Sequence, residues 1–279
     1  MKTEPIVMER TYAAPVAKVW KALTDKNDMK QWYFDLSDFK PEVGFEFTFI
    51  GTDGKKSFLH LCKIIEVIPQ RKLKHSWRYD GVPGDSFVTW ELFEEGKNRT
   101  RVKLTHEGLE SFPQDTTDYA KQNFIKGWTA IVGTELLEYV EVSDIVKAIE
   151  INVTPEHLWK LLVSVEAVTQ WAEAFSGGTE VESDFKKGSA IVWRDGTGAI
   201  GASGFISARE DGALLEFTYP DDTEVNASNP YKERFTISAH NGKSTLKIEA
   251  GPLPKKYVKI HDPKWDEALV KIRAMAVRR

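Results

Sequence analysis

The sequence of 279 residues lacks several features that would assign it to a specialised class of protein. It has a single cysteine, Cys62, which cannot form an internal disulfide and is typical of a reducing compartment. No apolar run approaches the roughly 18 residues of a membrane-spanning helix. The opening segment, MKTEPIVMER, contains no apolar stretch typical of a signal peptide. We therefore expect a cytoplasmic location and no membrane span.

An excess of either charge is also missing, since 38 basic and 42 acidic residues leave a net charge of −4. Residues 1–142 carry 20 basic and 22 acidic side chains, and residues 143–279 carry 18 and 20. Neither half has a basic excess to neutralise phosphates, so nucleic acid is not an expected partner. Hydrophobic residues make up 41% of the chain, which is sufficient for one or two packed cores.

The sequence does contain an internal repeat, in which one pattern of residues occurs twice. Trp20 and Trp32 match Trp159 and Trp171 at an offset of 139 residues. Ordered matches at similar offsets predict two copies of one unit, as domains 1–142 and 145–279 with a very short linker near 141–144. The further matches are Gly44 with Gly188, Asp53-Gly54 with Asp195-Gly196, Gly96-Lys97 with Gly242-Lys243, and Trp128 with Trp265.

Each half has the same order of expected elements. A short strand (6–12 or 146–153) leads to Pro15 or Pro155, and proline suits the first turn of a helix. Segments of alternating or continuous apolar residues then predict antiparallel strands. A helical pattern closes each half, over 119–140 in the first and, shorter, over 263–277 in the second. The predicted fold class is α+β, with a curved antiparallel sheet wrapped around a long C-terminal helix in each half.

The stretch RDGTGAIGASG contains the pattern G-x-G-x-x-G, from Gly196 to Gly201. In a dinucleotide-binding site these glycines follow a strand and open a helix, whose N–H groups receive the pyrophosphate. Here the following SGFISARE has no helical period, and the repeat aligns Asp195-Gly196 with Asp53-Gly54. The pattern therefore predicts a hairpin turn and no nucleotide site.

A succession of motifs runs through the first half: EVIP (66–69), KL (72–73) with Trp77, VTWEL (88–92), THEGL (105–109) and GW (127–128). With these motifs the first half resembles the AHSA1-like family, named for the C-terminal domain of the activator of Hsp90 ATPase, within the START and Bet v1-like (helix-grip, SRPBCC) superfamily. The resemblance implies two tandem helix-grip domains with a cavity between sheet and long helix, in a superfamily whose members bind lipids, hormones or polyketides, or act as enzymes or co-chaperones. The second half is a diverged copy, because EAGPL (249–253) replaces THEGL.

Period-two alternation places His60, Cys62, His75 and His106 on inward faces of their strands. Three histidines and a thiol could bind zinc, or they could be core groups that each have a hydrogen-bond partner. Because no close ligand pair such as C-x-x-C or H-x-x-x-H is present, we expect no metal site and no cofactor.

The tryptophans also allow two interpretations, as core residues or as the lining of a pocket. Trp20, Trp32 and Trp128 recur in both halves, which favours a packing role. Trp77 and Trp90 lie on strands, beside inward polar residues, and have no evident counterpart in the second half. An apolar pocket with a few polar groups is the usual small-molecule site. The predicted ligand-binding residues are Phe47, His60, Trp77, Tyr79, Trp90 and His106.

Three functions are compatible with the sequence. The first is a non-catalytic protein whose first domain encloses an apolar cavity for a small hydrophobic molecule. The second is a regulator of an Hsp90-type ATPase, with a chaperone as partner, which the family name suggests. The third is a cyclase- or hydrolase-like enzyme with His106 or His60 as its base. We expect the first, with no catalytic residues; no feature of the sequence identifies the ligand or shows that the second domain keeps a cavity.

Overall fold

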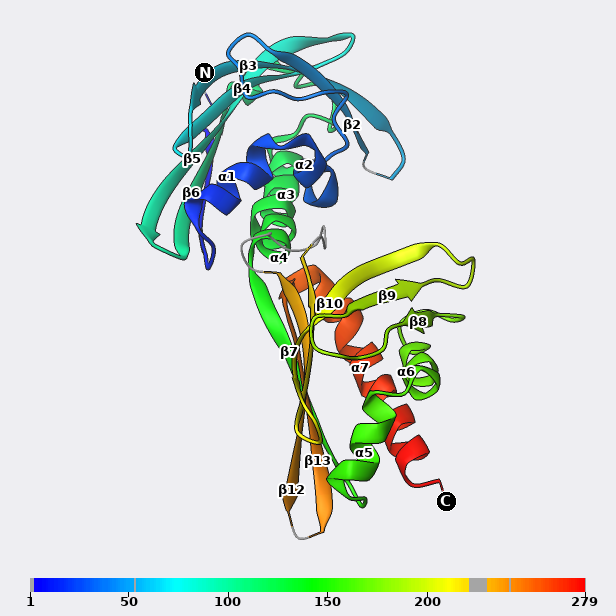
Figure 1. The fold of residues 1–279 in the computed structure, drawn as a ribbon. Helices are drawn as coiled ribbons and strands as arrows, with labels where there is room; N and C mark the ends of the chain where they lie inside the picture. Colours follow the sequence, from blue (N-terminus) through cyan, green and yellow to red (C-terminus); the bar gives the residue numbers. More distant parts are fainter. Residues whose placement is uncertain (1–2, 53, 221–229, 241, 279) are drawn as a thin grey trace. The chain divides into compact units, whose positions relative to one another are not determined.

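The chain forms two compact units, residues 1–141 and 142–279, in a computed structural model that describes all residues except 1–2, 53, 221–229, 241 and 279 (Figure 1). The first strand of the second unit begins at Val142, so the segment expected to be a linker at 141–144 lies almost entirely within that strand.

The first unit is a six-stranded antiparallel sheet in the order β1-β6-β5-β4-β3-β2, which curves over the helix that ends the unit (Figure 1). This is the predicted helix-grip arrangement. A π-helical segment, η2, divides that helix into α3 and α4, and Arg10 and Tyr12 of β1 donate to its carbonyls of Gly133 and Val132. Its elements are β1 (Ile6–Tyr12), α1 (Val16–Thr24), α2 (Lys26–Trp32), β2 (Glu46–Thr52), β3 (Ser57–Ile68), β4 (Lys72–Tyr79), β5 (Val82–Gly96), β6 (Arg99–Glu107), η1 (Leu109–Ser111), α3 (Lys121–Ala130), η2 (Ile131–Glu135) and α4 (Leu136–Val140).

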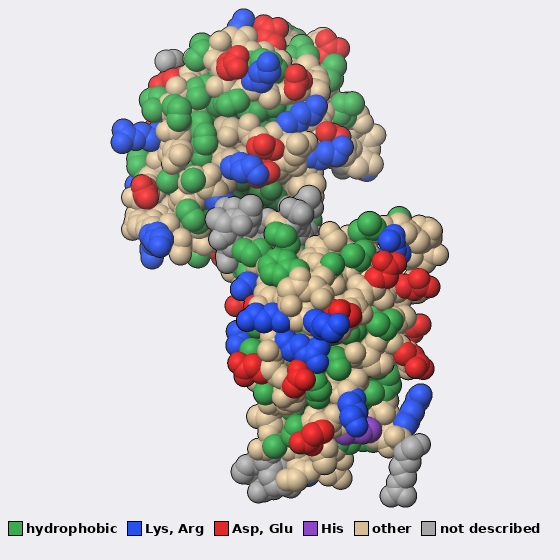
Figure 2. Space-filling view, viewed as in Figure 1, with side chains coloured by type: hydrophobic (Ala, Val, Ile, Leu, Met, Phe, Trp, Pro, Cys, Tyr) green, Lys and Arg blue, Asp and Glu red, His purple; other side chains and the backbone are tan. Residues whose placement is uncertain are grey.

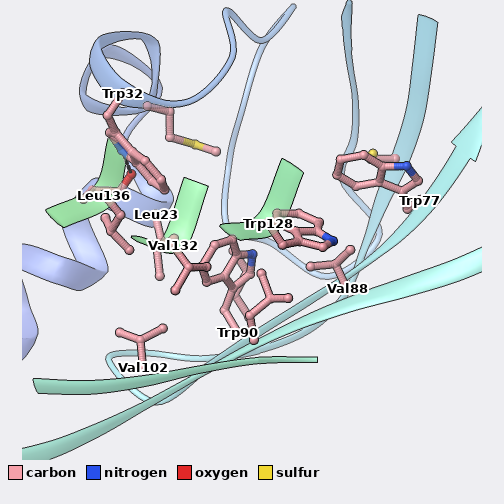
Figure 3. Close-up of a cluster of buried hydrophobic side chains, with 14 of the residues drawn as sticks. Leu23, Trp32, Trp77, Val88, Trp90, Val102, Trp128, Val132 and Leu136 are labelled. Atoms are coloured by element: carbon pink, nitrogen blue, oxygen red, sulfur yellow. Dashed lines mark hydrogen bonds between the residues drawn. The ribbon is translucent and has the colours of Figure 1, made fainter. Parts of the chain in front are cut away.

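The core of the first unit lies between the concave face of the sheet and the long helix. The alternation expected from the sequence is confirmed, because the inward residues of β3 to β6 are buried or half-buried while most of their neighbours face out. Figure 3 shows Trp128 and Val132 of the helix facing Trp90 and Val88 of the sheet, and the rings of Trp90 and Trp128 meet edge to face at 5.8 Å. The aromatic rings therefore account for much of the contact between the two layers.

The second unit repeats this plan with one additional short strand, in the sheet order β7-β13-β12-β11-β10-β9-β8. Its core is built around Trp171, Phe217, Phe235 and Trp265. The elements are β7 (Val142–Ile151), α5 (Pro155–Leu162), α6 (Val165–Ala172), β8 (Glu180–Glu182), β9 (Ala190–Arg194), β10 (Ile200–Glu210), β11 (Leu214–Tyr219), β12 (Tyr231–His240), β13 (Lys243–Pro254) and α7 (Lys255–Ala276).

The expected start of the last helix at residue 263 is wrong. Helix α7 begins at Lys255, directly after β13, and continues through Pro263 for 22 residues. Proline lacks the N–H that the helix would use and its ring crowds the preceding turn, which is why the sequence suggested a helix start there. The earlier turns pack Tyr257 and Val258 against the second core. The second grip helix is therefore not the shorter one.

Equivalent backbone hydrogen bonds confirm the internal repeat. The N–H of Gly44 donates to the carbonyl of Ile64 at 2.9 Å, and that of Gly188 donates to Ile206 at 2.8 Å. Both glycines have positive φ, of 93° and 85°, a conformation that other residues rarely adopt. The same glycine turn thus precedes the β2–β3 hairpin in the first unit and the β9–β10 hairpin in the second.

The G-x-G-x-x-G stretch is a hairpin turn, as predicted. It joins β9 to β10, which pair antiparallel. The Asp195 carboxylate accepts from the backbone N–H groups of Thr197 and Ala199, at 2.9 and 3.1 Å. A strand rather than a helix follows the glycines, so no helix N-terminus is present there to receive a pyrophosphate. Asp53, the matched residue of the first unit, lies outside the described residues.

Acidic and basic side chains are interspersed over the visible face of each unit (Figure 2). This mixture is typical of a solvated surface. Within the described part of the chain, no helix combines the length and apolarity needed to cross a membrane.

Candidate functional site

The first unit contains a cavity of about 540 Å³ between the sheet and α3. Strands β2, β3 and β4 form one wall, and one face of α3 forms the other. Most of the lining is aromatic, with polar groups from α3 and from the segment before it. The lining residues are Phe34, Gly51, Thr52, Phe58, His60, Trp77, Tyr79, Asp118, Tyr119, Asn123, Phe124, Lys126, Gly127, Trp128, Ala130 and Ile131.

Three of the six residues proposed as ligand contacts line this cavity: His60, Trp77 and Tyr79. The other three are not among its lining residues, although all are buried. Phe47 packs edge to face on Phe39 and His75, Trp90 packs on Trp128, and His106 lies under Trp77 and Phe124. Alternation in sequence identifies which face of a strand points inward. It does not show where along the strand the packed core gives way to open space.

His60 is a neutral polar group inside an aromatic wall. Its ring stacks on Phe49, with 4.2 Å between ring centroids, and contacts Trp77 and Tyr79 at 4.7 and 4.6 Å. Burial lowers the pKa of His60 to about 4, and the backbone of Phe49 and Phe58 opposes this only in part. Its Nδ1 has no hydrogen-bond partner among the described residues. At neutral pH the ring is therefore uncharged, and this nitrogen is buried away from the accessible surface of the cavity.

Trp77 and Tyr79 are adjacent inward residues of β4. The Trp77 indole N–H donates to the Tyr79 hydroxyl at 3.1 Å. Burial also raises the pKa of Tyr79 well above its usual value, so the phenol stays neutral. This wall presents ring surface and one hydroxyl group to the cavity, with no net charge.

His106 is held by a chain of hydrogen bonds. The Trp128 indole N–H donates to Nδ1 at 3.0 Å, which requires the hydrogen of the neutral ring to be on Nε2. Nε2 then donates to the Ser86 hydroxyl at 2.9 Å, and this hydroxyl donates to the Trp77 carbonyl at 2.9 Å. Burial lowers the pKa of His106 to about 3. With both ring nitrogens engaged and no exposed surface, His106 is placed to hold the wall together rather than to act as a base.

The other two groups weighed as metal ligands are also in packed surroundings. His75 donates from Nδ1 to the Ser76 carbonyl at 2.9 Å, and burial lowers its pKa to about 4. Burial raises the pKa of the Cys62 thiol well above its usual value, which disfavours the thiolate that a metal needs. Among the residues that the structure describes, no three His, Cys, Asp or Glu side chains are grouped to hold a metal ion.

The helical wall was not among the residues proposed from the sequence. Asn123, Phe124, Gly127, Trp128 and Ile131 line the cavity at spacings of three and four, so they share one face of the helix. Helical periodicity in GW and its surroundings could have identified this wall. The rim is polar: Lys56, which precedes β3, pairs with Asp118 at 2.8 Å.

The second unit also contains a cavity, of about 590 Å³, a point that the sequence had left open. Its wall carries a chain of hydrogen bonds from Trp193 to Tyr219 at 2.9 Å, and from Tyr219 to Glu233 at 3.1 Å. The lining residues are Trp171, Ala172, Phe175, Ser176, Thr179, Trp193, Arg194, Asp195, Ile200, Gly201, Ala202, Ser203, Tyr219, Tyr231, Glu233 and His261.

Sequence reasoning missed the polar residues of this second cavity. Tyr231 and Glu233 alternate on the inward face of β12 together with Phe235, and an acidic residue between inward aromatic residues was the available signal. Trp193 is on β9, on a strand that does not correspond to the strand of Trp77, so aligning the two halves did not reveal it.

The chain was compared with known proteins. No curated protein matches it in sequence. Among solved structures it is similar to DynU16, from the dynemicin biosynthetic locus (18% identity, 98% of this chain and 99% of that chain covered, TM-score 0.41). It is also similar to the di-domain ARO/CYC StfQ from the steffimycin biosynthetic pathway (10% identity, 97% and 98% covered, TM-score 0.39) and to a Bacillus halodurans protein (26% identity, 50% and 99% covered, TM-score 0.41).

A family model described as "Activator of Hsp90 ATPase homolog 1-like protein" matches twice, at residues 13–141 and 152–276. The two matches together span most of the sequence, and each falls within one of the two compact units. The chain therefore belongs to the activator of Hsp90 ATPase homolog 1-like family, as two tandem helix-grip domains of the Bet v1-like type.

Proposed function

We propose that the first domain is a non-catalytic binding module that holds one small, apolar, uncharged molecule in the cavity between its sheet and α3. The observation that carries the proposal is the cavity itself, about 540 Å³ with a mostly aromatic lining. Cavities of roughly 300–1,000 Å³ with apolar walls and a few polar groups are the usual form of small-molecule sites.

The polar groups in the wall support a neutral guest. His60 is uncharged at neutral pH, and the hydroxyl of Tyr79 remains protonated. Of the two charged lining residues, Asp118 is already paired with Lys56 at the rim, and Lys126 is exposed on α3 rather than part of the inner wall. A charged guest would lose its hydration without gaining a partner of opposite charge at the inner wall. A molecule with one carbonyl or hydroxyl group could instead use the hydroxyl of Tyr79, which lines the cavity, accepts from Trp77 and keeps its own hydrogen to donate.

The first test is native mass spectrometry of the purified full-length protein, compared with its mass under denaturing conditions. We expect additional mass in the native spectrum only, from a retained guest that fragmentation can identify. In parallel, the neutral fluorophore N-phenyl-1-naphthylamine serves as a probe of the cavity. We expect saturable binding with a blue-shifted emission, because the probe moves into an apolar environment.

A pair of variants on α3 locates the binding. Gly127 lines the cavity, and an added Cβ there would have no atom within 4 Å. Gly127→Phe should place a ring in this space and abolish probe binding. Thr129→Phe adds the same ring at an exposed position outside the lining and should leave binding unchanged. If the wild type holds no guest and binds no probe, or if both variants bind equally well, the proposal is wrong. Measurement of Hsp90 ATP turnover would then be the next experiment.

A further inference from the structure

The cavity of the second domain has a wall that differs in chemistry from that of the first. Five aromatic rings from α6, the turn after it, β9, β11 and β12 surround it. The ring of Trp171 lies 6.5 Å from that of Phe175 and 6.1 Å from that of Trp193, in both cases edge to face. The rings of Tyr219 and Tyr231 stack at 5.6 Å. The faces of such rings carry partial negative charge.

A carboxylate lies in the same wall. Glu233 accepts hydrogen bonds from Tyr219 at 3.1 Å and from Tyr231 at 3.0 Å, one on each oxygen. Tyr219 in turn accepts from the indole N–H of Trp193 at 2.9 Å. The hydrogens of all three groups are thus directed along the chain toward the carboxylate. To a guest these groups present lone pairs and ring faces rather than donor hydrogens.

The other charged groups of this lining are tied to the protein surface. The Arg194 guanidinium donates from Nε to Glu182 at 2.7 Å and from Nη1 to the Gly198 carbonyl. The Asp195 carboxylate closes the hairpin turn by accepting from Thr197 and Ala199. His261 also lines the cavity. Glu233, by contrast, accepts hydrogen bonds from two aromatic hydroxyls of the cavity wall itself.

We propose that the second domain is a separate binding site for an organic cation, a small molecule that carries a protonated or quaternary amine. Aromatic rings around a cavity attract ammonium groups through their negative faces, most strongly where water is excluded. A carboxylate in the same wall adds direct charge attraction and favours a cation over a neutral molecule of the same shape. The cavity, of about 590 Å³, has room for such a guest. This site is additional to the neutral-guest site of the first domain and does not depend on it.

The test uses two probes of matched shape on the full-length protein. Benzyltrimethylammonium carries a permanent positive charge, and neopentylbenzene has a carbon atom in place of its nitrogen. Isothermal titration calorimetry should give saturable binding of the ammonium probe, with at least about tenfold higher affinity than for the neutral probe. Equal affinities for the two probes, or no saturable binding of the ammonium probe, would overturn the proposal. This comparison on the wild type decides even if a variant fails to fold.

Variants then locate the site. Glu233→Gln keeps the shape of the side chain and should weaken ammonium binding about tenfold. Trp193→Leu removes one aromatic face and should weaken it about threefold to tenfold. Glu249→Gln makes the same charge change elsewhere in the domain, at a residue paired with Lys247 outside the lining, and should have no effect. Full affinity in a folded Glu233→Gln protein would contradict the assignment, as would equal losses in Glu233→Gln and Glu249→Gln.

Discussion

Trp128 and Trp265 occupy matching positions on the grip helices of the two domains, but their indole N–H groups have different surroundings. Trp128 donates to His106 and so joins a chain that continues through Ser86 to Trp77. Trp265 is fully buried among aromatic rings, and its N–H has no hydrogen-bond partner among the described residues. The repeat has kept the apolar shape of the position but not its polar network. The packing of the tryptophan is therefore common to both domains, whereas its hydrogen bonding differs between them.

The two cavities differ in a similar way. Tyr79 and Tyr219 are the last residues of corresponding strands, and each accepts a hydrogen bond from a tryptophan. In the first domain the tryptophan is Trp77 on the same strand, whereas in the second it is Trp193, on a strand two places away in the sheet. The tyrosine then donates to Glu233 in the second domain. Both domains thus have a hydrogen bond from a tryptophan to this tyrosine, but the tryptophan comes from a different strand in each. Only in the second domain does the chain of hydrogen bonds continue to a carboxylate, that of Glu233.

The largest expected difference between the domains is their response to acid. His60, His75 and His106 are buried, and their pKa values fall from the usual 6.5 to about 4, 4 and 3. Below about pH 6.5 the unfolded chain binds protons that the folded domain does not, so stability is lost as pH falls toward these values. From pH 7 to 5 each histidine should cost about 2 kcal/mol of unfolding free energy.

Hydrogen exchange followed by mass spectrometry measures the decrease in unfolding free energy separately in each domain. No buried histidine is found among the described side chains of the second domain, so we expect a shallower decline there over the same range. His106→Gln should reduce the pH dependence of the first domain by about one histidine's share, because glutamine can keep both hydrogen bonds without titrating. Equal pH dependence in the two domains would contradict the prediction.

A smaller difference is expected when the matched tryptophans are shortened. Trp128→Phe and Trp265→Phe remove similar volume, but the first also leaves Nδ1 of His106 buried without its donor. The unfolding free energy should therefore fall by about 1–3 kcal/mol more in Trp128→Phe than in Trp265→Phe. Denaturant titration monitored by domain-resolved exchange measures both losses. The two variants losing the same free energy would mean that the His106 chain adds no stability.

The smallest effect concerns the π-helical segment η2. Tyr12 donates from its hydroxyl to the Val132 carbonyl at 2.6 Å, and the matched residue of the second domain is the apolar Ile151. Tyr12→Phe should cost about 1 kcal/mol, since a buried carbonyl of the segment loses its donor. Amide exchange in residues 131–135 should accelerate, while exchange in α7 stays unchanged. A variant that exchanges like the wild type in η2 would show that Arg10 alone is sufficient.

The candidate site was only partly predictable. Alternation correctly placed His60, Trp77 and Tyr79 on an inward face, and all three line the first cavity. It placed Phe47 and Trp90 inward too, but Phe47 packs on Phe39 and His75, and Trp90 packs on Trp128 of α3. Where a gap opens between two layers depends on the curvature of the sheet and on the side chains of the facing helix. Neither can be read from a single strand.

The sequence by itself determined the duplication, the α+β class, the inward faces of the strands and the turn at the glycine-rich stretch. These features follow from local periodicity and from backbone preferences of glycine and proline, which act over a few residues. Only the tertiary structure decided that α7 passes through Pro263, that His106 is fully engaged, and that Trp193, Tyr219 and Glu233 meet in one wall. Those outcomes depend on contacts between residues far apart in the chain, which the folded sheet and helix bring together.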